Sequence, residues 1–211
     1  IWLRDLLPGY VVVYDEESGL YRLKGPGPYS VGLLKSFFAN TVPLVWAYVY
    51  ILMRGPQGLR KVTEHAVLIT NYFAKLAGEI RGFDIPYGKG RWRKHEVVLS
   101  AKPMADETGV TAEDVAKGLL DAGLYAPTMY FPLIVKEALQ TEFTETETLE
   151  NVDKYVERLK QISEVAYSSP GKAKEWPVNT SATRIDVAKA NHPKYVAPTW
   201  RVYVKRLKGE L

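Results

Sequence analysis

The feature that most constrains the fold is an uninterrupted apolar segment at residues 43–53, PLVWAYVYILM. A helix needs about 20 consecutive apolar residues to cross a bilayer, and this segment has about half that length. The sequence therefore predicts a helix that is buried in a protein core and does not span a membrane. Hydrophobic residues make up 46% of the 211-residue chain, which is enough for a packed core.

Charge and cysteine content restrict the function classes. The formal net charge of +4 and the isoelectric point of about 9.0 permit an anionic partner, but they fall short of a polybasic nucleic-acid binder. The chain has no cysteine, which excludes disulfides, thiolate nucleophiles and cysteine-ligated zinc. No signal peptide opens the sequence, so we expect a cytoplasmic protein. The first residue is Ile1, which predicts a fragment of something longer.

Breaks in composition divide the chain into three parts. Proline and glycine interrupt residues 1–30, which predicts a connector or hairpin. Residues 31–167 carry the periodic patterns of helices and of a small α+β domain. Residues 168–211 are rich in Pro, Lys, Ser and Thr, which predicts an extended C-terminal arm that lies on a surface.

Periodicity predicts the elements of the central part. Helices are expected at about 43–53 and 57–80, with the break at Arg54-Gly55-Pro56. Strands are expected at 95–101 and within 127–143, where residues 138–143 alternate like a half-buried strand. Start signals predict two further helices. Thr111 and Asp114 form a capping box at the start of one, and Thr146 or Thr148 can cap the start of the other. Mixed helices and strands in this order give a compact α+β unit.

No metal site is predicted. The histidines His65, His95 and His192 lie far apart and form no H-x-x-x-H pattern. The acidic residues at 144–150 precede a helix, where they complement its dipole. His95 and Glu96 could form a catalytic pair, but neighbouring strand residues face opposite ways, which favours a histidine satisfied by local hydrogen bonds.

Two polar clusters allow more than one interpretation. Lys89, Arg91, Arg93 and Lys94 surround Trp92, which is compatible with phosphate or single-strand binding but also with a solvated loop. Ser36 and Asn40 precede the apolar helix, where free backbone N–H groups can meet an anion, although N-capping alone explains Asn40. No catalytic triad, dinucleotide loop or Walker loop is present.

Six blocks of the sequence, in one order, resemble a known family. The blocks are SVGLLKSFFANTVPLVWAYVYI at 30–51, GLRKVTEHAVLITNYFAKLAG at 58–78, HEVVLSA at 95–101, TAEDVAKGLLDAGLYAPTMYFPLIV at 111–135, TETETLENVDKYVERL at 144–159 and RIDVAKANHP at 184–193. Together they resemble the C-terminal part of glycine dehydrogenase (decarboxylating), the P protein of the glycine cleavage system, in its subunit 2 form. The resemblance is colinear and covers nearly the whole chain.

The resemblance implies a fold and an activity. The fold would be the C-terminal small domain of a fold-type-I, aspartate-aminotransferase-like enzyme that depends on pyridoxal phosphate, with linking helices and an extended C-terminal arm. The family's enzyme decarboxylates glycine and passes the aminomethyl group to the lipoyl arm of the H protein. Pyridoxal phosphate serves as the electron sink for such chemistry. The implied partners are an upstream pyridoxal-phosphate-binding domain, subunit 1, the H protein and glycine; no membrane is expected, and nucleic acid is a less favoured partner.

The chain departs from a complete enzyme of this family. The family's cofactor lysine stands in an N-x-H-K motif that is followed by a glycine-rich stretch, and neither is found here. The letters NHPK at 191–194 have the wrong order and no glycine run, so Lys194 is not a substitute. We therefore expect the isolated chain to be inactive, as a fragment of a longer subunit or a product of proteolysis.

The resemblance also assigns expected roles to the polar clusters. Ser36, Asn40 and His95 are expected at the rim of the substrate and cofactor cleft. Ala39 stands where the family commonly has glycine, and its Cβ disfavours a close backbone approach at that point. The cluster of Lys89, Arg91, Arg93 and Lys94 is expected at a rim that meets an anionic substrate and an acidic carrier protein. The alternatives are the small domain of another fold-type-I enzyme and, less favoured, a basic RNA-binding module.

Overall fold

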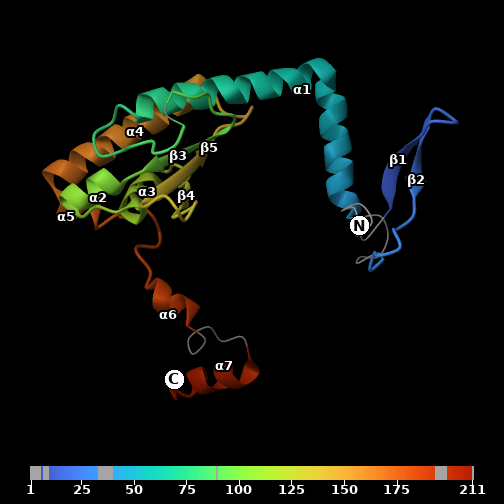
Figure 1. Cartoon of the computed structure of the whole chain (residues 1–211). Helices are drawn as coiled ribbons and strands as arrows, with labels where there is room; N and C mark the ends of the chain where they lie inside the picture. The colour runs from blue at the N-terminus through green and yellow to red at the C-terminus, as the bar shows by residue number, and fades with distance from the viewer. Residues whose placement is uncertain (1–5, 7–9, 33–39, 89, 193–198, 211) are drawn as a thin grey trace. The chain divides into compact units, whose positions relative to one another are not determined.

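The computed structural model describes residues 6, 10–32, 40–88, 90–192 and 199–210, and it contains two compact units (Figure 1). Unit 1 comprises Ile1–Leu59 and unit 2 comprises Arg60–Leu211. The sequence had predicted boundaries near residues 30 and 167. That division into a connector, a central part and an arm stays a prediction, and the two compact units divide the chain within one long helix.

Unit 1 begins with an antiparallel hairpin of β1 (Val11–Asp15) and β2 (Leu20–Lys24). The turn closes with a backbone hydrogen bond from the Gly19 N–H to the Asp15 carbonyl at 2.9 Å. Gly19 has a φ of 67°, a conformation that glycine adopts without steric cost. Arg22 forms an ion pair with the Asp15 carboxylate at 2.7 Å across the two strands.

Helix α1 (Thr41–Ala77) contains the predicted break. Gly55 has non-helical angles (φ 60°, ψ 179°) and Pro56 follows it. Proline disfavours helical geometry at the residue before it, and glycine tolerates a positive φ, so this pair interrupts the helix. The two helices that the sequence predicted are therefore present, joined at a kink.

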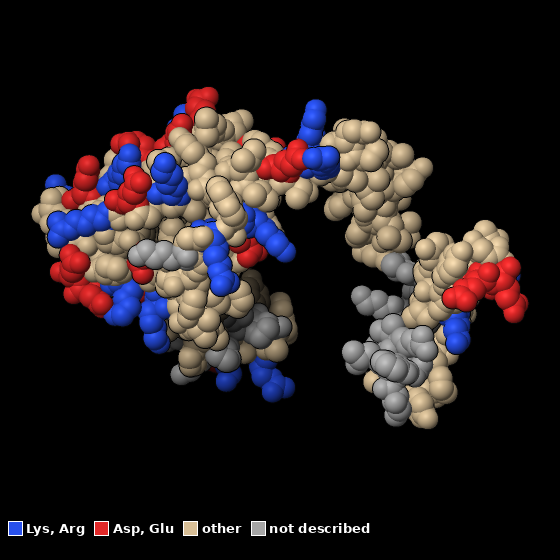
Figure 2. Space-filling model, turned by 45° about the horizontal axis from the view of Figure 1, so that its top comes forward, with Lys and Arg blue, Asp and Glu red and all other residues tan. Residues whose placement is uncertain are grey.

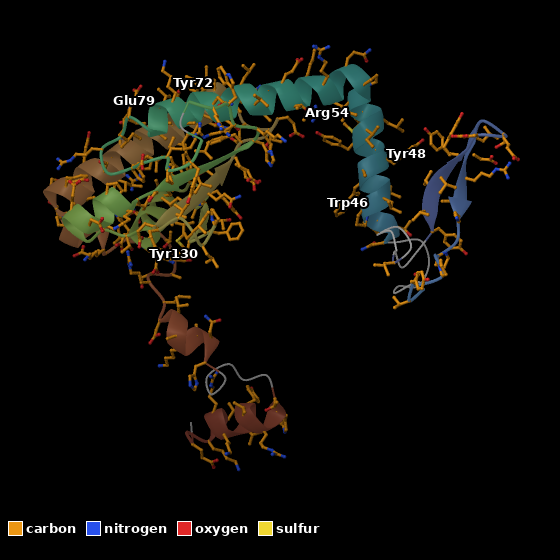
Figure 3. All side chains as sticks on the ribbon, viewed as in Figure 1. Trp46, Tyr48, Arg54, Tyr72, Glu79 and Tyr130 are labelled. Carbon is orange, nitrogen blue, oxygen red and sulfur yellow. The ribbon has the colours of Figure 1, made fainter. Side chains whose placement is uncertain are left out.

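The prediction that residues 43–53 form a buried helix is wrong for this chain. The residues are helical, but every side chain from Thr41 to Arg54 is exposed. Trp46 and Met53 are 70% and 79% exposed, and Figure 3 shows Trp46 and Tyr48 projecting from the helix. Figure 2 shows largely uncharged surface along this helix. Within the described residues no other element covers this surface. The apolar pattern therefore predicted the helix correctly, but the described part of the chain does not bury it.

Unit 2 is built on a three-stranded antiparallel sheet in the order β3-β5-β4. Its strands are β3 (Glu96–Ser100), β5 (Ala138–Glu142) and the short β4 (Thr128–Met129). Val97 pairs with Thr141, and Leu99 pairs with Leu139. These four side chains are buried, whereas Glu96 and Glu142 are exposed. One face of the sheet therefore contributes to the core, as the predicted alternation in 138–143 required.

Three helices and the second half of α1 complete the core of unit 2. They are α2 (Lys102–Thr108), α3 (Ala112–Asp121) and α4 (Leu149–Ser168). Helix α3 begins at the predicted capping box of Thr111 and Asp114, and Thr148 caps α4 by accepting a hydrogen bond from the Asn151 N–H. Fully buried side chains from every one of these elements form a single core; among the largest are Phe73, Leu99, Met104, Leu119, Leu139, Leu159 and Ile162.

The C-terminal segment is less extended than the sequence suggested. It contains α5 (Pro170–Ala173), α6 (Val187–Asn191) and α7 (Trp200–Leu207). Asp186 caps α6, and Thr199 caps α7, which explains why helices begin there. The high content of Pro, Lys, Ser and Thr predicted an extended arm and gave no indication of these two capped helices.

Two buried carboxylates on α3 hold the start of this segment. Asp121 accepts hydrogen bonds from the backbone N–H groups of Val178 and Asn179 at 2.6 and 2.7 Å. Asp114 forms an ion pair with Arg184. The part of the chain between Val178 and Arg184 thus lies on this unit's own surface.

Crossing a bilayer would require a longer uncharged apolar helix than any found in the described part of the chain.

Replacement of Gly118 by alanine tests the packing of α3. A Cβ at Gly118 would lie 2.7 Å from the Trp176 ring and 3.1 Å from Ile162. Overpacking of this kind costs about 1–3 kcal/mol, so we expect Gly118→Ala to lower the free energy of unfolding by that amount in urea denaturation.

Gly171→Ala is the matched control, because a Cβ there meets no heavy atom within 4 Å. An equal loss of stability in both variants would show that the Trp176 contact is not the cause.

Candidate functional site

The predicted cleft residues before α1 are only partly described. Ser36 lies outside the described residues. Asn40 is exposed, and its Oδ1 accepts a hydrogen bond from the Val42 N–H at 3.2 Å. This is the local bond of an N-capping residue, and it leaves the amide group at the surface.

His95 lies immediately before β3 and contacts its neighbour. Its Nε2 is 3.3 Å from Glu96 Oε1, and both side chains are about half exposed. The sequence had predicted that only one of the two side chains could face a given pocket. Because His95 precedes the strand, the alternation does not separate the two side chains, and they form a local pair.

The basic loop, defined as residues 88–94, is shaped by its own hydrogen bonds. Lys89 lies outside the described residues, whereas Arg91 and Lys94 are exposed. The Arg93 guanidinium folds back and donates to the backbone carbonyls of Tyr87 at 2.9 Å and Arg91 at 3.2 Å. Arg93 is therefore engaged in maintaining the loop, and Arg91 and Lys94 are the described cations that it presents to solvent.

Asn71 on α1 fixes the basic loop to unit 2. Its Nδ2 donates to the Arg93 carbonyl at 2.8 Å, and its Oδ1 accepts from the Arg93 N–H at 2.9 Å. The two bonds satisfy both backbone groups of one loop residue, as a neighbouring strand would. Trp92 next to this clamp is 86% exposed.

A groove of about 540 Å³ separates the basic loop from α1. The residues along it include Lys75 and Arg91 but also Glu79 and Asp84. Its charge is therefore mixed, and the cations of the loop do not form an uninterrupted basic surface. Such a groove is less suited to a nucleic-acid backbone than the sequence of the loop alone suggested.

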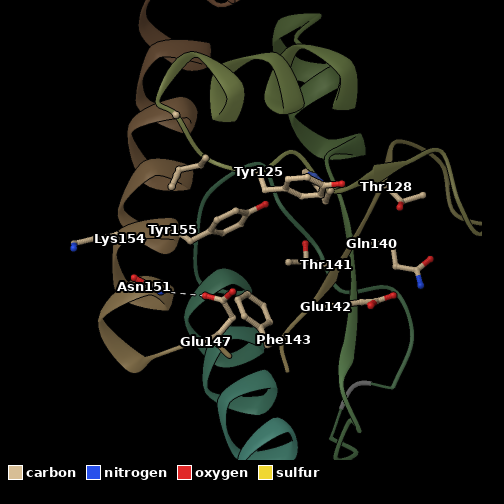
Figure 4. Close-up of a pocket in the computed structure, with 13 residues that line it drawn as sticks. Tyr125, Thr128, Gln140, Thr141, Glu142, Phe143, Glu147, Asn151, Lys154 and Tyr155 are labelled. Carbon is tan, nitrogen blue, oxygen red and sulfur yellow. Dashed lines mark hydrogen bonds between the residues drawn. The ribbon is translucent and has the colours of Figure 1, made fainter. Parts of the chain in front are cut away.

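A second cavity, of about 640 Å³, lies where β5 approaches the start of α4 (Figure 4). We refer to it as the β5–α4 cavity. Its lining includes Tyr125, Thr141, Phe143, Glu147 and Tyr155. Figure 4 shows the hydroxyl groups of Thr141 and Tyr155 directed into the same space, whereas Gln140 and Glu142 project to the other side of the strand.

The polar groups of the β5–α4 cavity are unusual for a buried location. Thr141 is only 8% exposed, and its Oγ1 has no hydrogen-bond partner among the described residues. Burial raises the pKa of the Tyr155 phenol well above its ordinary value, an effect that the nearby Thr141 hydroxyl partly opposes. Tyr155 therefore remains a neutral phenol at physiological pH.

Sequence reasoning missed this cavity, although one signal was present. In the alternating segment 138–143, Thr141 takes the inward position between Leu139 and Phe143. A polar side chain on the buried face of a strand is uncommon, because burying a hydroxyl without a partner costs free energy. The contribution of Tyr155 was not visible, since it depends on how α4 packs against the sheet.

No group of three or more histidine or carboxylate side chains suited to a metal ion occurs in the part of the chain that the structure describes. The acidic residues around the start of α4 make local contacts instead. Glu150 pairs with Lys154, and Glu147 accepts from Asn151.

Comparison with known families identifies the family to which the chain belongs. Residues 62–185, more than half of the chain, match the family described as "Glycine dehydrogenase, C-terminal domain". The chain belongs to this family. The resemblance seen in the sequence blocks is thereby confirmed, including its assignment to the C-terminal part of subunit 2.

Curated relatives of the glycine dehydrogenase family agree with this assignment. "Probable glycine dehydrogenase (decarboxylating) subunit 2" of Staphylothermus marinus is 69% identical over 98% of this chain and 40% of its own length. The proteins of the same name from Aeropyrum pernix and Pyrococcus furiosus are 58% and 49% identical, each over 100% of this chain and 41% of their own length. The chain thus spans about two fifths of the relatives it matches.

A solved structure supports the fold. The crystal structure of glycine decarboxylase (P-protein) of the glycine cleavage system, in inhibitor-bound form, matches with a TM-score of 0.53 and 20% identity. The match covers 75% of this chain and 36% of that one. The prediction of an α+β C-terminal domain of this glycine dehydrogenase fold is confirmed.

Replacement of Asn71 by alanine tests the clamp on the basic loop. The variant loses both bonds to Arg93, and two hydrogen bonds of this kind contribute about 1–3 kcal/mol. We expect the Arg93 amide to exchange with deuterium roughly tenfold faster or more, measured by NMR under native conditions.

Asn191→Ala is the control, because Asn71 and Asn191 both donate to the carbonyl four residues earlier but only Asn71 reaches the loop. Unchanged exchange at Arg93 in Asn71→Ala would contradict the clamp.

Proposed function

We propose that this chain acts as the C-terminal part of a pyridoxal-phosphate-dependent glycine decarboxylase, glycine dehydrogenase (decarboxylating) of the subunit 2 type. The observation that carries the proposal is the 69% identity to the Staphylothermus marinus protein of that name over 98% of the chain. In the complete enzyme, glycine would lose its carboxylate as carbon dioxide, and the aminomethyl group would pass to the lipoyl arm of the H protein. Pyridoxal phosphate, when bound, supplies the electron sink for this decarboxylation.

The described residues of this chain do not themselves fit covalent attachment of the cofactor. A Schiff-base lysine is activated by a desolvated surrounding, which lowers its pKa. Among the described lysines, Lys117 is partly buried and the others are exposed. Lys194, in the NHPK segment, lies outside the described residues. We therefore place the cofactor lysine in a portion of the longer enzyme that this chain does not include, and we expect the isolated chain to be inactive.

The exposed apolar helix of unit 1 supports contact with a partner that also has an apolar surface. Residues 41–53 contain no charged side chain, and Trp46 alone is 70% exposed. Monomeric proteins rarely leave an apolar surface of this size uncovered. We assign this helix to contact with the pyridoxal-phosphate-binding domain of the complete enzyme, where the burial predicted from the sequence would be achieved.

Polar and charged residues of both units are assigned in this proposal to the groups that face substrate and carrier. Arg91 and Lys94 are the exposed cations of the basic loop, and they would meet the acidic H protein. Ser36, Asn40 and His95 would lie at the edge of the glycine and lipoyl entry, with subunit 1 as the neighbouring subunit. The proposed location is cytoplasmic.

A chimaeric subunit tests the proposed function. The 211 residues replace the corresponding region of the Staphylothermus marinus subunit 2, and the product is combined with subunit 1, lipoyl H protein, pyridoxal phosphate and glycine. The measurement is the exchange of labelled bicarbonate into the carboxyl group of glycine. We expect an exchange rate within about tenfold of the unaltered enzyme, which corresponds to about 1.4 kcal/mol in the barrier.

The Staphylothermus marinus subunit without this region is the control, and it should show no exchange. Cofactor absorbance of the chimaera reports whether the protein has folded around pyridoxal phosphate. A chimaera that binds the cofactor normally and exchanges no bicarbonate would refute the proposal.

A further inference from the structure

The β5–α4 cavity is not used by the proposed function, and its chemistry indicates a ligand of its own. It is a concave site of about 640 Å³, within the ordinary range for binding small organic molecules. Its wall combines aromatic rings with a few polar groups. The cavity lies entirely within unit 2, because its lining residues belong to 123–155.

Two of the polar groups in the cavity, the Thr141 hydroxyl and the Glu147 carboxylate, have acceptor capacity that the described residues leave unused. Thr141 Oγ1 is buried and has no partner among the described residues. Glu147 receives one hydrogen bond from Asn151 Nδ2, at 3.2 Å to Oε2. A carboxylate accepts about four such bonds, so its acceptor capacity is largely unused by that contact. A ligand that donates several hydrogen bonds would satisfy these groups.

The charges on the lining favour a cation. Glu147 contributes a carboxylate that faces the cavity, and Lys154 is the only basic side chain among the described residues that line it. Lys154 pairs with Glu150 at 2.7 Å, and in Figure 4 it projects away from the cavity. The cation that the site could have used to neutralise Glu147 is therefore already engaged elsewhere.

The aromatic walls favour the same kind of ligand. Phe143 and Tyr155 meet edge to face, with centroids 6.3 Å apart and an interplanar angle of 89°. Tyr125, which also lines the cavity, is 92% exposed and free of core packing. The negative faces of aromatic rings attract organic cations.

We propose that the β5–α4 cavity binds a compact organic cation, an alkylammonium or guanidinium group, between its aromatic walls. Glu147 provides the countercharge, and the hydroxyl groups of Thr141 and Tyr155 accept hydrogen bonds from the cation. The cationic group can come from a free small amine or from the lysine or arginine side chain of a polypeptide. Both sources share the chemistry that the site recognises.

The test uses the 211-residue chain and amide NMR, with n-butylammonium chloride as the first probe and 1-butanol as its neutral counterpart. We expect saturable shifts at Thr141, Glu147 and Tyr155 with the ammonium ion and no saturable shifts with the alcohol. Glu147→Gln should weaken binding roughly tenfold or more, and Thr141→Val, which replaces the hydroxyl with a methyl of similar size, should weaken it severalfold.

Glu164→Gln is the matched control, because it removes the same charge from an exposed position on α4, outside the cavity. It should leave the affinity unchanged. Equal shifts with 1-butanol, no saturation with n-butylammonium, or equal affinity in wild type and Glu147→Gln would each overturn the proposal, provided that the variant spectrum shows an intact fold.

A second probe distinguishes the sources of the cation. Nα-acetyl-lysine methylamide carries the same ammonium group on a peptide backbone. Tighter binding of this compound than of n-butylammonium would support the site and assign it to a polypeptide side chain. Equal or weaker binding would support the site and assign it to a free amine.

Discussion

Three aromatic rings hold the parts of unit 2 in place. Phe73 comes from α1, Phe143 follows β5 and Tyr155 comes from α4; their centroids lie 4.5, 5.9 and 6.3 Å apart in pairs. Aromatic pairs of this kind contribute about 0.5–1.5 kcal/mol each beyond the burial of their surface. Because the rings come from α1, from α4 and from the residue directly after β5, the cluster fixes α1, α4 and the sheet together. The β5–α4 cavity lies against the same cluster, and Asn71, which clamps the basic loop, lies two residues before Phe73.

Unit 1 has the opposite character, since its apolar surface is formed but not covered. Burial of one large apolar side chain contributes about 1.5–3 kcal/mol, and residues 42–53 expose ten such side chains, from Val42 to Met53. The hairpin adds Val12, Leu20 and Leu23, each more than 60% exposed. In our proposal this surface joins the chain to the cofactor-binding domain. The core of unit 2 would then position the basic loop, while burial of the apolar surface of unit 1 would supply the free energy of association with the cofactor-binding domain.

The sequence predicted local structure well where one residue determines it. Gly55 with Pro56 located the kink in α1, and Thr111 with Asp114 located the start of α3. The sequence was a poor guide to features that depend on contacts between residues distant in the chain. Burial of residues 43–53 depends on a covering surface that the described residues do not supply, and the helices α6 and α7 depend on caps within a segment of unhelpful composition.

The candidate site followed the same rule. The cations of the basic loop were visible in the sequence, but the clamp by Asn71 is a contact across 22 residues and could not be inferred from composition. Arg93 looked equivalent to Arg91 until the structure showed its guanidinium bound to loop carbonyls. The β5–α4 cavity required Thr141 and Tyr155 to meet from separate elements. Only the inward position of Thr141 indicated it in advance.

In our proposal this chain shapes a rim of the enzyme but does not itself hold the cofactor. This proposal is tested most directly by borohydride reduction of the isolated chain with pyridoxal phosphate, followed by intact-mass spectrometry and peptide mapping. We expect no adduct, or scattered substoichiometric labelling of exposed lysines. A single stoichiometric adduct at one lysine would contradict it, because the chain would then carry its own Schiff-base site.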